Sequence, residues 1–353
     1  MSESRLESPS LAAPAARPRV LSGIRPTGAA FQLGNYLGAV RHWAAMQDEA
    51  ECFFFLADLH ALTEVPDPER LRARTRSSAA ELLAMGVDPA RSAVFAQSHL
   101  PQHAELAWVL GCLTGFGEAS RMTQFKEKGA SSSSGATVGL FYYPVLQAAD
   151  ILMYQADSVP IGEDQRQHLE LTRDLAQRFN ARYGQTFVVP GPYVGKAGAR
   201  IKDLQEPGRK MSKTIGGAGT LWVLDEPKVL MKKVRSAVTD TGREVVFDVD
   251  AKPGISNLMT ILSEASGTPV DDVQQRFAGA GYGDFKAAVA DAVVELFAPV
   301  RARYAELMSD PGELDRVLAD GAARAGEVAE TTMAAVRDRI GLLPPSVRVP
   351  APL

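Results

Sequence analysis

Short apolar runs alternate with longer helical patterns over the first part of the chain, and this alternation restricts the possible fold more than any other feature. RVLSG and ECFFFLAD have the composition of buried strands, and SAVFAQS and FVVPGP that of shorter ones. PERLRARTRSSAAELLAMG and PQHAELAWVLGCL, which lie among these runs, have the apolar spacing of helices. Strands that alternate with helices predict βαβ units, in which the strands lie parallel in one sheet. We therefore expect a parallel α/β domain of the size that binds nucleotides.

Beyond about residue 225 the pattern becomes mainly helical. Apolar residues recur at helical spacing, with proline and glycine as helix stops, in EPKVLMKKVRSAV, SNLMTILSEAS, VDDVQQRF, FKAAVADAVVELFAPVRARYAELMS and GELDRVLADGAARAGEVAETTMAAVRDRI. Residues 1–17 are rich in serine, proline and alanine without periodicity, which predicts a disordered tail. The 353 residues therefore suggest an α/β domain followed by a helical domain.

The composition argues against several classes of protein. A net charge of −4 gives no overall positive field, so any nucleic-acid binding has to come from a local basic patch. Cys52 and Cys112 form no CxxC pair, which argues against disulfide frameworks and structural zinc, and we expect no metal held by protein ligands. No apolar run reaches about 18 residues and no secretory signal is recognisable. We expect no membrane span and a cytoplasmic location.

Two glycine-containing segments have the character of phosphate-binding loops. QLGNYLG, residues 32–38, stands at a strand-to-helix junction, and a helix that begins near Leu33 leaves free N–H groups that favour anions. Gly34 and Gly38 would keep that face open, although for this segment alone an ordinary glycine turn is the commoner explanation. EPGRKMSKTIGGAGT, residues 206–219, places Lys210 and Lys213 in a loop that either closes on phosphate or is simply solvated.

The segment YYPVLQAADILMY, residues 142–154, combines an apolar helix with a row of polar side chains. Pro144 suits a first helical position, so we expect the helix to begin there. Tyr143, Gln147, Asp150 and Tyr154 then share one face. This face is either the wet side of an amphipathic helix or the wall of a specificity pocket, in which the carboxylate accepts a substrate N–H or O–H.

Two further segments are ambiguous on their own. In SVPIGEDQRQHLELTRDLAQRF, residues 158–179, an apolar stretch ends at Gly162 and acidic residues start a helix. This fits first-turn chemistry and also the ribose site of doubly wound folds. In RMTQFKEKGASSSSG, residues 121–135, Lys126 and Lys128 would be taken for surface lysines.

Taken in order, these segments resemble the tryptophanyl-tRNA synthetases, a family of class I aminoacyl-tRNA synthetases, from about Val20 to Arg339. QLGN stands where class I enzymes carry their HIGH signature, and KMSKT at 210–214 matches KMSKS. RMTQFKEK, YPVLQAADIL, GEDQRQHLELTRDLA and KPGISNL are close to phrases of the family. The resemblance implies a Rossmann-like doubly wound parallel sheet with a C-terminal helical domain. It divides the chain into the tail 1–17, a catalytic domain 18–205 with a dimer-forming insertion, and residues 206–345 with the KMSKT loop and an anticodon-binding domain.

The resemblance also implies a reaction in two steps. The carboxylate of L-tryptophan attacks the α-phosphate of ATP, which gives tryptophanyl-adenylate and pyrophosphate, and the terminal adenosine of tRNA(Trp) then takes the acyl group. Mg²⁺ is expected to bind through the ATP phosphates, and a second copy of the chain is expected as a partner in a homodimer. Catalysis would rest on positioning and on electrostatic stabilisation of the leaving group.

Matched residue by residue, the resemblance assigns three sets of side chains. The catalytic lysines on the phosphates are Lys128, Lys210 and Lys213. The ATP-binding residues are Arg25, Gln32, Gly34, Asn35, Gly38, Gly162, Asp164, Lys210, Met211, Ser212 and Lys213. The tryptophan-binding residues are His60, Tyr143, Gln147, Asp150, Val159, Ile161 and Gln165, of which Tyr143 and Gln165 would hold the ammonium group and Asp150 the indole N–H. Candidate tRNA contacts in the helical domain are Lys232, Lys233, Arg235, Arg301 and Arg303.

Several positions depart from the family pattern. Gln32 replaces the first residue of the HIGH signature, and the loop before it is one residue longer than usual. Arg25 stands where GIQP is usual, which brings a cation near the amino-acid site. Gln147 replaces a common Met and Leu59 a frequent Gln. We hypothesise that Arg25, Leu59 and Gln147 alter discrimination among tryptophan analogues.

Three other functions remain open at this point. A tyrosine-specific synthetase shares the fold and both signatures, because a buried carboxylate accepts a phenol O–H as readily as an indole N–H. A synthetase-derived protein could sense amino acid or nucleotide without charging tRNA, a reading that Gln32 and Arg25 leave open. A nucleotidyltransferase with an HxGH-like loop would leave YPVLQAADIL and the helical domain unexplained.

Overall fold

The computed structural model describes residues 17–26, 30–122, 137–160, 162, 165–193, 201–211 and 217–343. Residues 1–16 of the expected tail lie outside the described residues.

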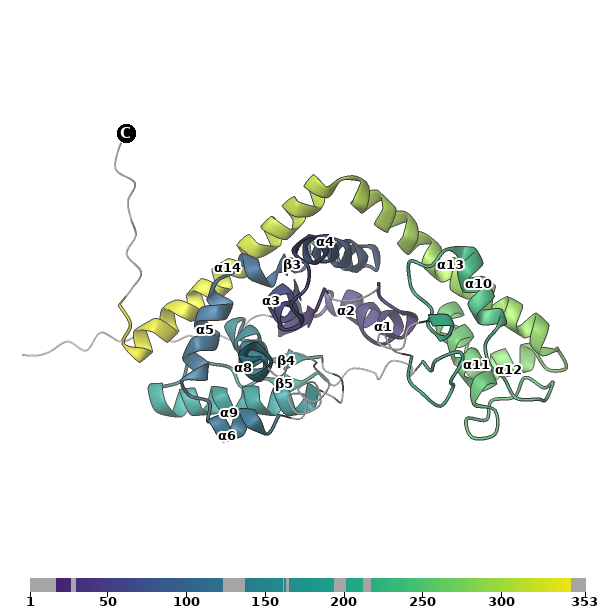
Figure 1. Cartoon of the computed structure of the whole chain (residues 1–353), viewed down its shortest axis with the longest axis horizontal. Helices are drawn as coiled ribbons and strands as arrows, with labels where there is room; N and C mark the ends of the chain where they lie inside the picture. The colour runs from purple at the N-terminus through teal and green to yellow at the C-terminus, as the bar shows by residue number, and fades with distance from the viewer. Residues whose placement is uncertain are drawn as a thin grey trace, which may run out of the picture.

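A parallel sheet organises the first part of the chain (Figure 1). In the described residues it has five strands, β1 Arg19–Ile24, β2 Glu51–Leu56, β3 Ala93–Ala96, β4 Ser158–Val159 and β5 Gly191–Pro192. Their spatial order is β3-β2-β1-β4-β5, and every neighbouring pair is parallel. The strand order reverses between β1 and β4, which is where doubly wound sheets bind ligands. The predicted parallel α/β fold is confirmed.

One predicted strand is much shorter than its pattern suggests. FVVPGP contributes only Gly191–Pro192 to the sheet. The side chain of Gln155 accepts the N–H of Val188, and Pro190 has no N–H to offer a neighbouring strand. The ladder therefore cannot extend backwards from Gly191.

Helices cover both faces of the sheet. They are α1 Leu33–Asn35, the π-helical turn η1 Tyr36–Val40, α2 Arg41–Met46, α3 Asp58–Ala61, η2 Leu62–Glu64, α4 Pro68–Ala84, η3 Gln97–His99, α5 Gln102–Gly111, α6 Phe116–Ser120, α8 Val138–Met153 and α9 Arg166–Tyr183. Along β2, Phe54 belongs to one core cluster and Phe53 and Phe55 to the other. Because both faces are buried, the strand is a continuous apolar run rather than an alternating one.

The helix that carries Asp150 begins earlier than its sequence suggests. The prediction that Pro144 opens the helix is wrong, since α8 starts at Val138 and contains Pro144 in its interior. The start is fixed by Thr137, whose side-chain hydroxyl accepts the N–H of Leu140. The extra turns place residues 138–143 beside the carboxyl ends of the strands.

The C-terminal part is helical, as predicted. It contains the short turn η5 Gly217–Gly219 and the helices α10 Pro227–Arg235, α11 Pro253–Ser266, α12 Val270–Arg276, α13 Tyr282–Ser309 and α14 Pro311–Ile340. In Figure 1 the long helices α13 and α14 meet at an angle, and α14 runs back to the sheet. Ala325, Ala329 and Met333 of α14 belong to the core cluster that also contains Phe53 and Phe95. The predicted domain boundary at 205/206 stays a prediction. The last helix, α14, packs with the sheet.

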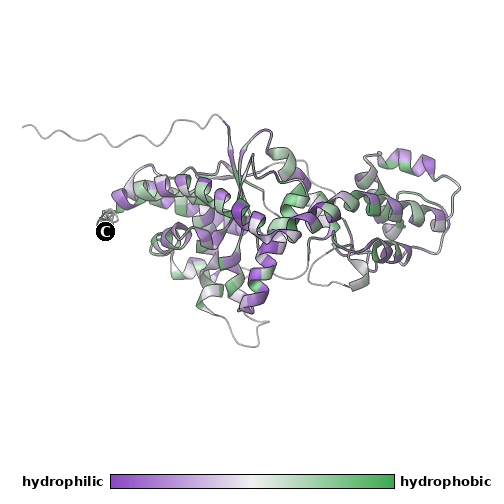
Figure 2. Cartoon of the chain, turned by 90° about the horizontal axis from the view of Figure 1, so that it is seen from above, coloured by the Kyte–Doolittle hydropathy of each residue, from purple (hydrophilic) through white to green (hydrophobic). Residues whose placement is uncertain are grey.

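Hydrophilic and hydrophobic residues are mixed along every long helix in Figure 2. In the described part of the chain no helix is long and apolar enough to cross a membrane. The apolar stripes are instead buried between helices and sheet.

Candidate active site

A cavity of about 450 Å³ opens at the carboxyl ends of β1, β2 and β4. This is the crevice at the point where the strand order reverses, and it is large enough for an amino acid. The described residues that line it are Leu21, Ser22, Gly23, Arg25, Phe55, Ala57, His60, Thr63, Leu140, Tyr143, Gln147, Asp150, Ile151, Val159, Pro160, Gly162 and Gln165. The structure thus brings together eight residues predicted for the site, Arg25, His60, Tyr143, Gln147, Asp150, Val159, Gly162 and Gln165.

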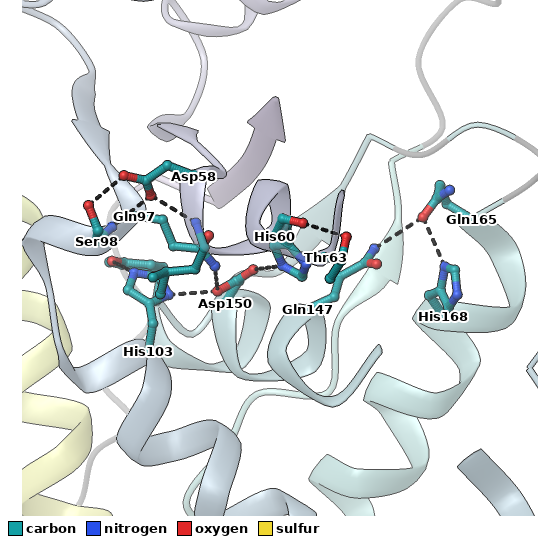
Figure 3. A network of polar contacts seen from close by, with 12 residues as sticks. Asp58, His60, Thr63, Gln97, Ser98, His103, Gln147, Asp150, Gln165 and His168 are labelled. Atoms are coloured by element: carbon teal, nitrogen blue, oxygen red, sulfur yellow. Dashed lines mark hydrogen bonds and ion pairs between the residues drawn. The ribbon is translucent and has the colours of Figure 1, made fainter. Parts of the chain in front are cut away.

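Asp150 is the buried charge of this cavity (Figure 3), with 1 % of its surface exposed. Its Oδ2 lies 2.8 Å from His60 Nε2. Its Oδ1 accepts from Gln97 Nε2 at 2.7 Å and lies 2.7 Å from His103 Nδ1. Burial alone would raise the pKa of the carboxyl, but the hydrogen bonds from His103 and His60 outweigh it and lower the pKa to about 2. Asp150 is therefore an ionised acceptor at neutral pH.

This low pKa predicts a pH-dependent contribution to stability. Because the pKa falls from 3.8 to about 2 on folding, the ionised carboxylate stabilises the fold by about 2 kcal/mol above about pH 4. The contribution is expected to disappear as the pH falls from about 4 towards 2, since the unfolded chain takes up a proton there before the folded one does. Urea unfolding of wild type and Asp150→Asn between pH 6 and pH 3 measures it. A stability difference between the two proteins that stays constant over this range contradicts the prediction.

Two residues behind Asp150, His103 and Gln97, were not predicted, and Tyr154 was placed on the helix face of Asp150 without a role. His103, on α5, is fully buried, and its Nε2 lies 2.8 Å from the hydroxyl of Tyr154. Gln97 follows β3 directly and is equally buried. The available signal was a polar residue at the carboxyl end of a predicted strand, and a histidine among the apolar residues of PQHAELAWVLGCL.

A second polar chain, drawn in Figure 3, joins Gln147, Gln165 and His168 beside the cavity. The hydroxyl of Tyr143 lies 3.1 Å from His168 Nε2. His168 Nδ1 in turn lies 2.9 Å from Gln165 Oε1. Gln147 Nε2 donates to the same Gln165 oxygen at 3.4 Å. Tyr143 and Gln165, both predicted to hold the substrate ammonium, are thus linked through His168, for which the sequence predicted no role.

Arg25 stands at the rim of the cavity. Its guanidinium donates to Glu64 Oε1 at 2.9 Å, and both side chains are exposed. Val159, predicted for the indole slot, is buried in the apolar lining. Leu59, which the discrimination hypothesis included, is not among the described residues that line the cavity.

The expectation of free N–H groups at the start of α1 is wrong. The N–H of Leu33 donates to Leu221 O, that of Gly34 to Gln32 Oε1 and that of Asn35 to Gln32 O. Gln32 is 2 % exposed, and its Nε2 donates to Met211 O at 3.1 Å. Both polar atoms of its side chain are therefore already hydrogen-bonded: Oε1 caps α1, and Nε2 links α1 to Met211 of the KMSKT segment.

The remaining predicted residues lie apart from the cavity lining or outside the described part. Gly38 is exposed in η1, with no heavy atom within 4 Å of the place where a Cβ would lie. Lys210 is exposed and pairs with Lys202 in an antiparallel bridge, while Met211 is buried. Lys128, Ile161, Asp164, Ser212 and Lys213 lie outside the described residues.

The basic residues proposed as tRNA contacts differ in their surroundings. Lys233 turns inward, where its Nζ donates to Thr220 O and pairs with Asp225 at 2.6 Å. Arg301 donates to Val294 O within α13. Lys232 and Arg235 instead line a shallow depression on α10. Lys233 and Arg301 are better explained as internal contacts of the helical part.

The fold and this cavity are those of a class I aminoacyl-tRNA synthetase. The family model described as tRNA synthetases class I (W and Y) matches residues 13–298. Tryptophan–tRNA ligase 2 of Streptomyces avermitilis is 55 % identical over 330 residues, which cover 93 % of this chain and 98 % of that protein. The chain belongs to this family, in its tryptophan–tRNA ligase branch.

Solved structures agree with this assignment. The tryptophanyl-tRNA synthetase of Mycoplasma pneumoniae superposes with a TM-score of 0.82 at 35 % identity, covering 93 % of this chain and 98 % of that one. The Campylobacter jejuni enzyme, complexed with ADP and tryptophan, gives a TM-score of 0.81 at 34 % identity, covering 92 % and 100 %.

Proposed function

We propose that this chain activates L-tryptophan with ATP, forming tryptophanyl-adenylate and pyrophosphate, and then transfers the tryptophanyl group to tRNA(Trp). The observation that carries the proposal is the ionised, buried Asp150 in the wall of an amino-acid-sized cavity. A buried carboxylate is costly unless it is hydrogen-bonded, and in this cavity it offers an acceptor for a ring N–H. The identity to tryptophan–tRNA ligases supports the same substrate.

The reaction needs no general base, because the substrate carboxylate is already a nucleophile. Tyr143 and Gln165 hold the ammonium group, Val159 and Ile161 line the indole slot, and these contacts aim the carboxylate at the α-phosphate. Lys128, Lys210 and Lys213 stabilise the charge that develops on pyrophosphate. The ATP residues assigned by the resemblance are Arg25, Gln32, Gly34, Asn35, Gly38, Gly162, Asp164, Met211 and Ser212.

The ATP residues near α1 differ in what they leave available for the nucleotide. Gln32, whose side chain is consumed by Gly34 and Met211, would act on ATP through the backbone it holds. Gly38 leaves an open surface for the nucleotide. Mg²⁺ would be bound through the ATP phosphates and would neutralise part of their charge. In the described residues no group of three or more His, Cys, Asp or Glu side chains could hold a metal ion.

We also propose a homodimer in the cytoplasm. Trp108 on α5, Phe116 on α6 and Val138 at the start of α8 are 71 %, 79 % and 81 % exposed. Both α5 and α6 pack against α8, and the ring of Phe116 lies 5.1 Å from that of Phe141 on α8. Large apolar side chains on adjoining elements are what a second copy would cover.

Amino-acid-dependent ATP–pyrophosphate exchange, run with each of the twenty amino acids, tests the proposal. We expect exchange with tryptophan, and charging of tRNA(Trp) in a second assay. Exchange with tyrosine instead would establish the tyrosine alternative. Retained tryptophan or ATP binding without any exchange would establish a sensing protein.

Arg25→Gln and Gln147→Met are expected to shift inhibition constants of indole-ring tryptophan analogues by about two- to tenfold, the effect of one hydrogen bond. Arg25 places a cation at the rim, and Gln147 places an amide in the lining beside Gln165. Inhibition of the exchange reaction measures the shift. Arg41→Gln, which removes an exposed guanidinium outside the cavity, is the matched control. Inhibition constants equal to those of wild type in both variants would contradict the hypothesis that these residues alter discrimination among tryptophan analogues.

A further inference from the structure

The hydrogen bonds around Asp150 leave one oxygen partly free. An ionised carboxylate only accepts hydrogen bonds and has about two acceptor sites on each oxygen. Oδ1 receives Gln97 Nε2 and His103 Nδ1, both at 2.7 Å, so its two sites are filled. Oδ2 receives His60 Nε2 at 2.8 Å. Among the described residues these are the donors that reach the carboxylate, so one acceptor site is left on Oδ2.

His103, one of the two hydrogen-bond partners of Oδ1, is held in place by its other contacts. The ring of His103 lies against Phe55 and Phe95, with centroids 6.0 Å and 6.2 Å away, and its Nε2 lies 2.8 Å from the hydroxyl of Tyr154. Burial raises the pKa of Tyr154 far above its ordinary value, so the hydroxyl keeps its proton and can donate it to Nε2. The proton of a neutral His103 then lies on Nδ1, which faces Asp150.

Gln97 is oriented by the same carboxylate. Its Oε1 is buried without a hydrogen-bond partner in the described part of the structure. Turning the amide around would place that oxygen against the carboxylate oxygen of Asp150. The unpaired Oε1 is therefore the cost of keeping Nε2 on Oδ1.

We propose that Gln97, His103 and Tyr154 are positioning residues for amino-acid selection. They occupy Oδ1 of Asp150 and so direct the remaining acceptor site, on Oδ2, to the ring N–H of the substrate. None of the three is among the described residues that line the cavity, so they act through Asp150. The inference rests on the proposed function, since it takes tryptophan as the substrate.

The arrangement also discriminates against tyrosine. A phenol O–H would find the acceptor on Oδ2, but the phenol oxygen would itself need a donor. The N–H groups of His60, His103 and Gln97 that face this point are already given to Asp150. An indole N–H has no lone pair to satisfy, so only the phenol leaves a buried polar atom unpaired.

The test compares tryptophan with β-(3-benzothienyl)alanine, in which sulfur replaces the ring N–H. Tyr154→Phe and Gln97→Met are each expected to raise KM for tryptophan about tenfold in ATP–pyrophosphate exchange, as expected for one hydrogen bond to a charged system. KM for the sulfur analogue and for ATP is expected to stay within about twofold of wild type. Tyr142→Phe is the matched control, because it removes a tyrosine hydroxyl of α8 that donates to Ala107 O and not to the groups around Asp150.

A rise in KM for tryptophan and the analogue together would show a merely structural role and overturn the inference, as would an unchanged KM for tryptophan in both variants. If either Tyr154→Phe or Gln97→Met fails to fold, the KM values of the other variant decide the test. If wild type shows no tryptophan-dependent exchange, the proposed function fails by itself. Calorimetric binding of tryptophan and of the analogue to wild type and variants then tests the inference independently.

Discussion

Asp150→Asn is expected to lower kcat/KM for tryptophan at least about a hundredfold in ATP–pyrophosphate exchange, with KM for ATP little changed. The donors from Gln97 and His103 would hold the amide oxygen of the new side chain. Its NH₂ group then occupies the place of Oδ2 and faces His60 and the substrate. His60 can move its proton to the other ring nitrogen and accept, but the indole N–H cannot. Two donors would meet where one acceptor is needed.

Asp58→Asn is the matched control for this variant. Asp58 lies in the neighbouring network and accepts from the backbone and hydroxyl of Ser98, but it is not among the described residues that line the cavity. The Asp58→Asn variant makes the same change from carboxylate to amide, but at a residue that does not contact the substrate. Equal losses in both variants, or a full kcat/KM in Asp150→Asn, would refute the assigned role of Asp150.

The position of Asp150 was predictable from the sequence, but its partners were not. Helical spacing alone puts Tyr143, Gln147 and Asp150 on one face, and a carboxylate among apolar residues calls for donors. His103 and Gln97 lie 47 and 53 residues away in sequence, on α5 and after β3. Which helix packs against α8, and by which face, is decided by the tertiary structure, on which a one-dimensional pattern carries no information.

Gln32 shows a different limit. The resemblance counted it among the ATP-binding residues, because it stands at the first position of the HIGH signature. The fold turns its side chain inward, where a cap and the carbonyl of Met211 use both polar atoms. Sequence position identified the right segment, but the direction of one side chain depends on residues 211 and 221–223, far along the chain.

The packing of α14 against the sheet likewise could not be recognised from its sequence, which has an ordinary helical pattern. Its middle is rich in alanine and glycine, which gives a weak apolar signal, yet these small residues allow the closest approach. The place where a Cβ on Gly321 would lie is 1.9 Å from the carbonyl oxygen of Val94 on β3, and 2.6 Å from its carbon. Only glycine allows the helix to sit on the strand at this distance.

Gly321→Ala is therefore expected to destabilise the protein by about 3 kcal/mol or more, because neither the strand backbone nor the helix can move without disturbing the core. Gly283→Ala is the control: it lies in α13 with open space around its would-be Cβ, and is expected to stabilise the helix by about 0.5–1 kcal/mol. Urea unfolding of the two variants beside wild type gives both values. If Gly321→Ala unfolds at the urea concentration of wild type, α14 does not depend on this contact to hold β3, and the close approach is not a constraint on the fold.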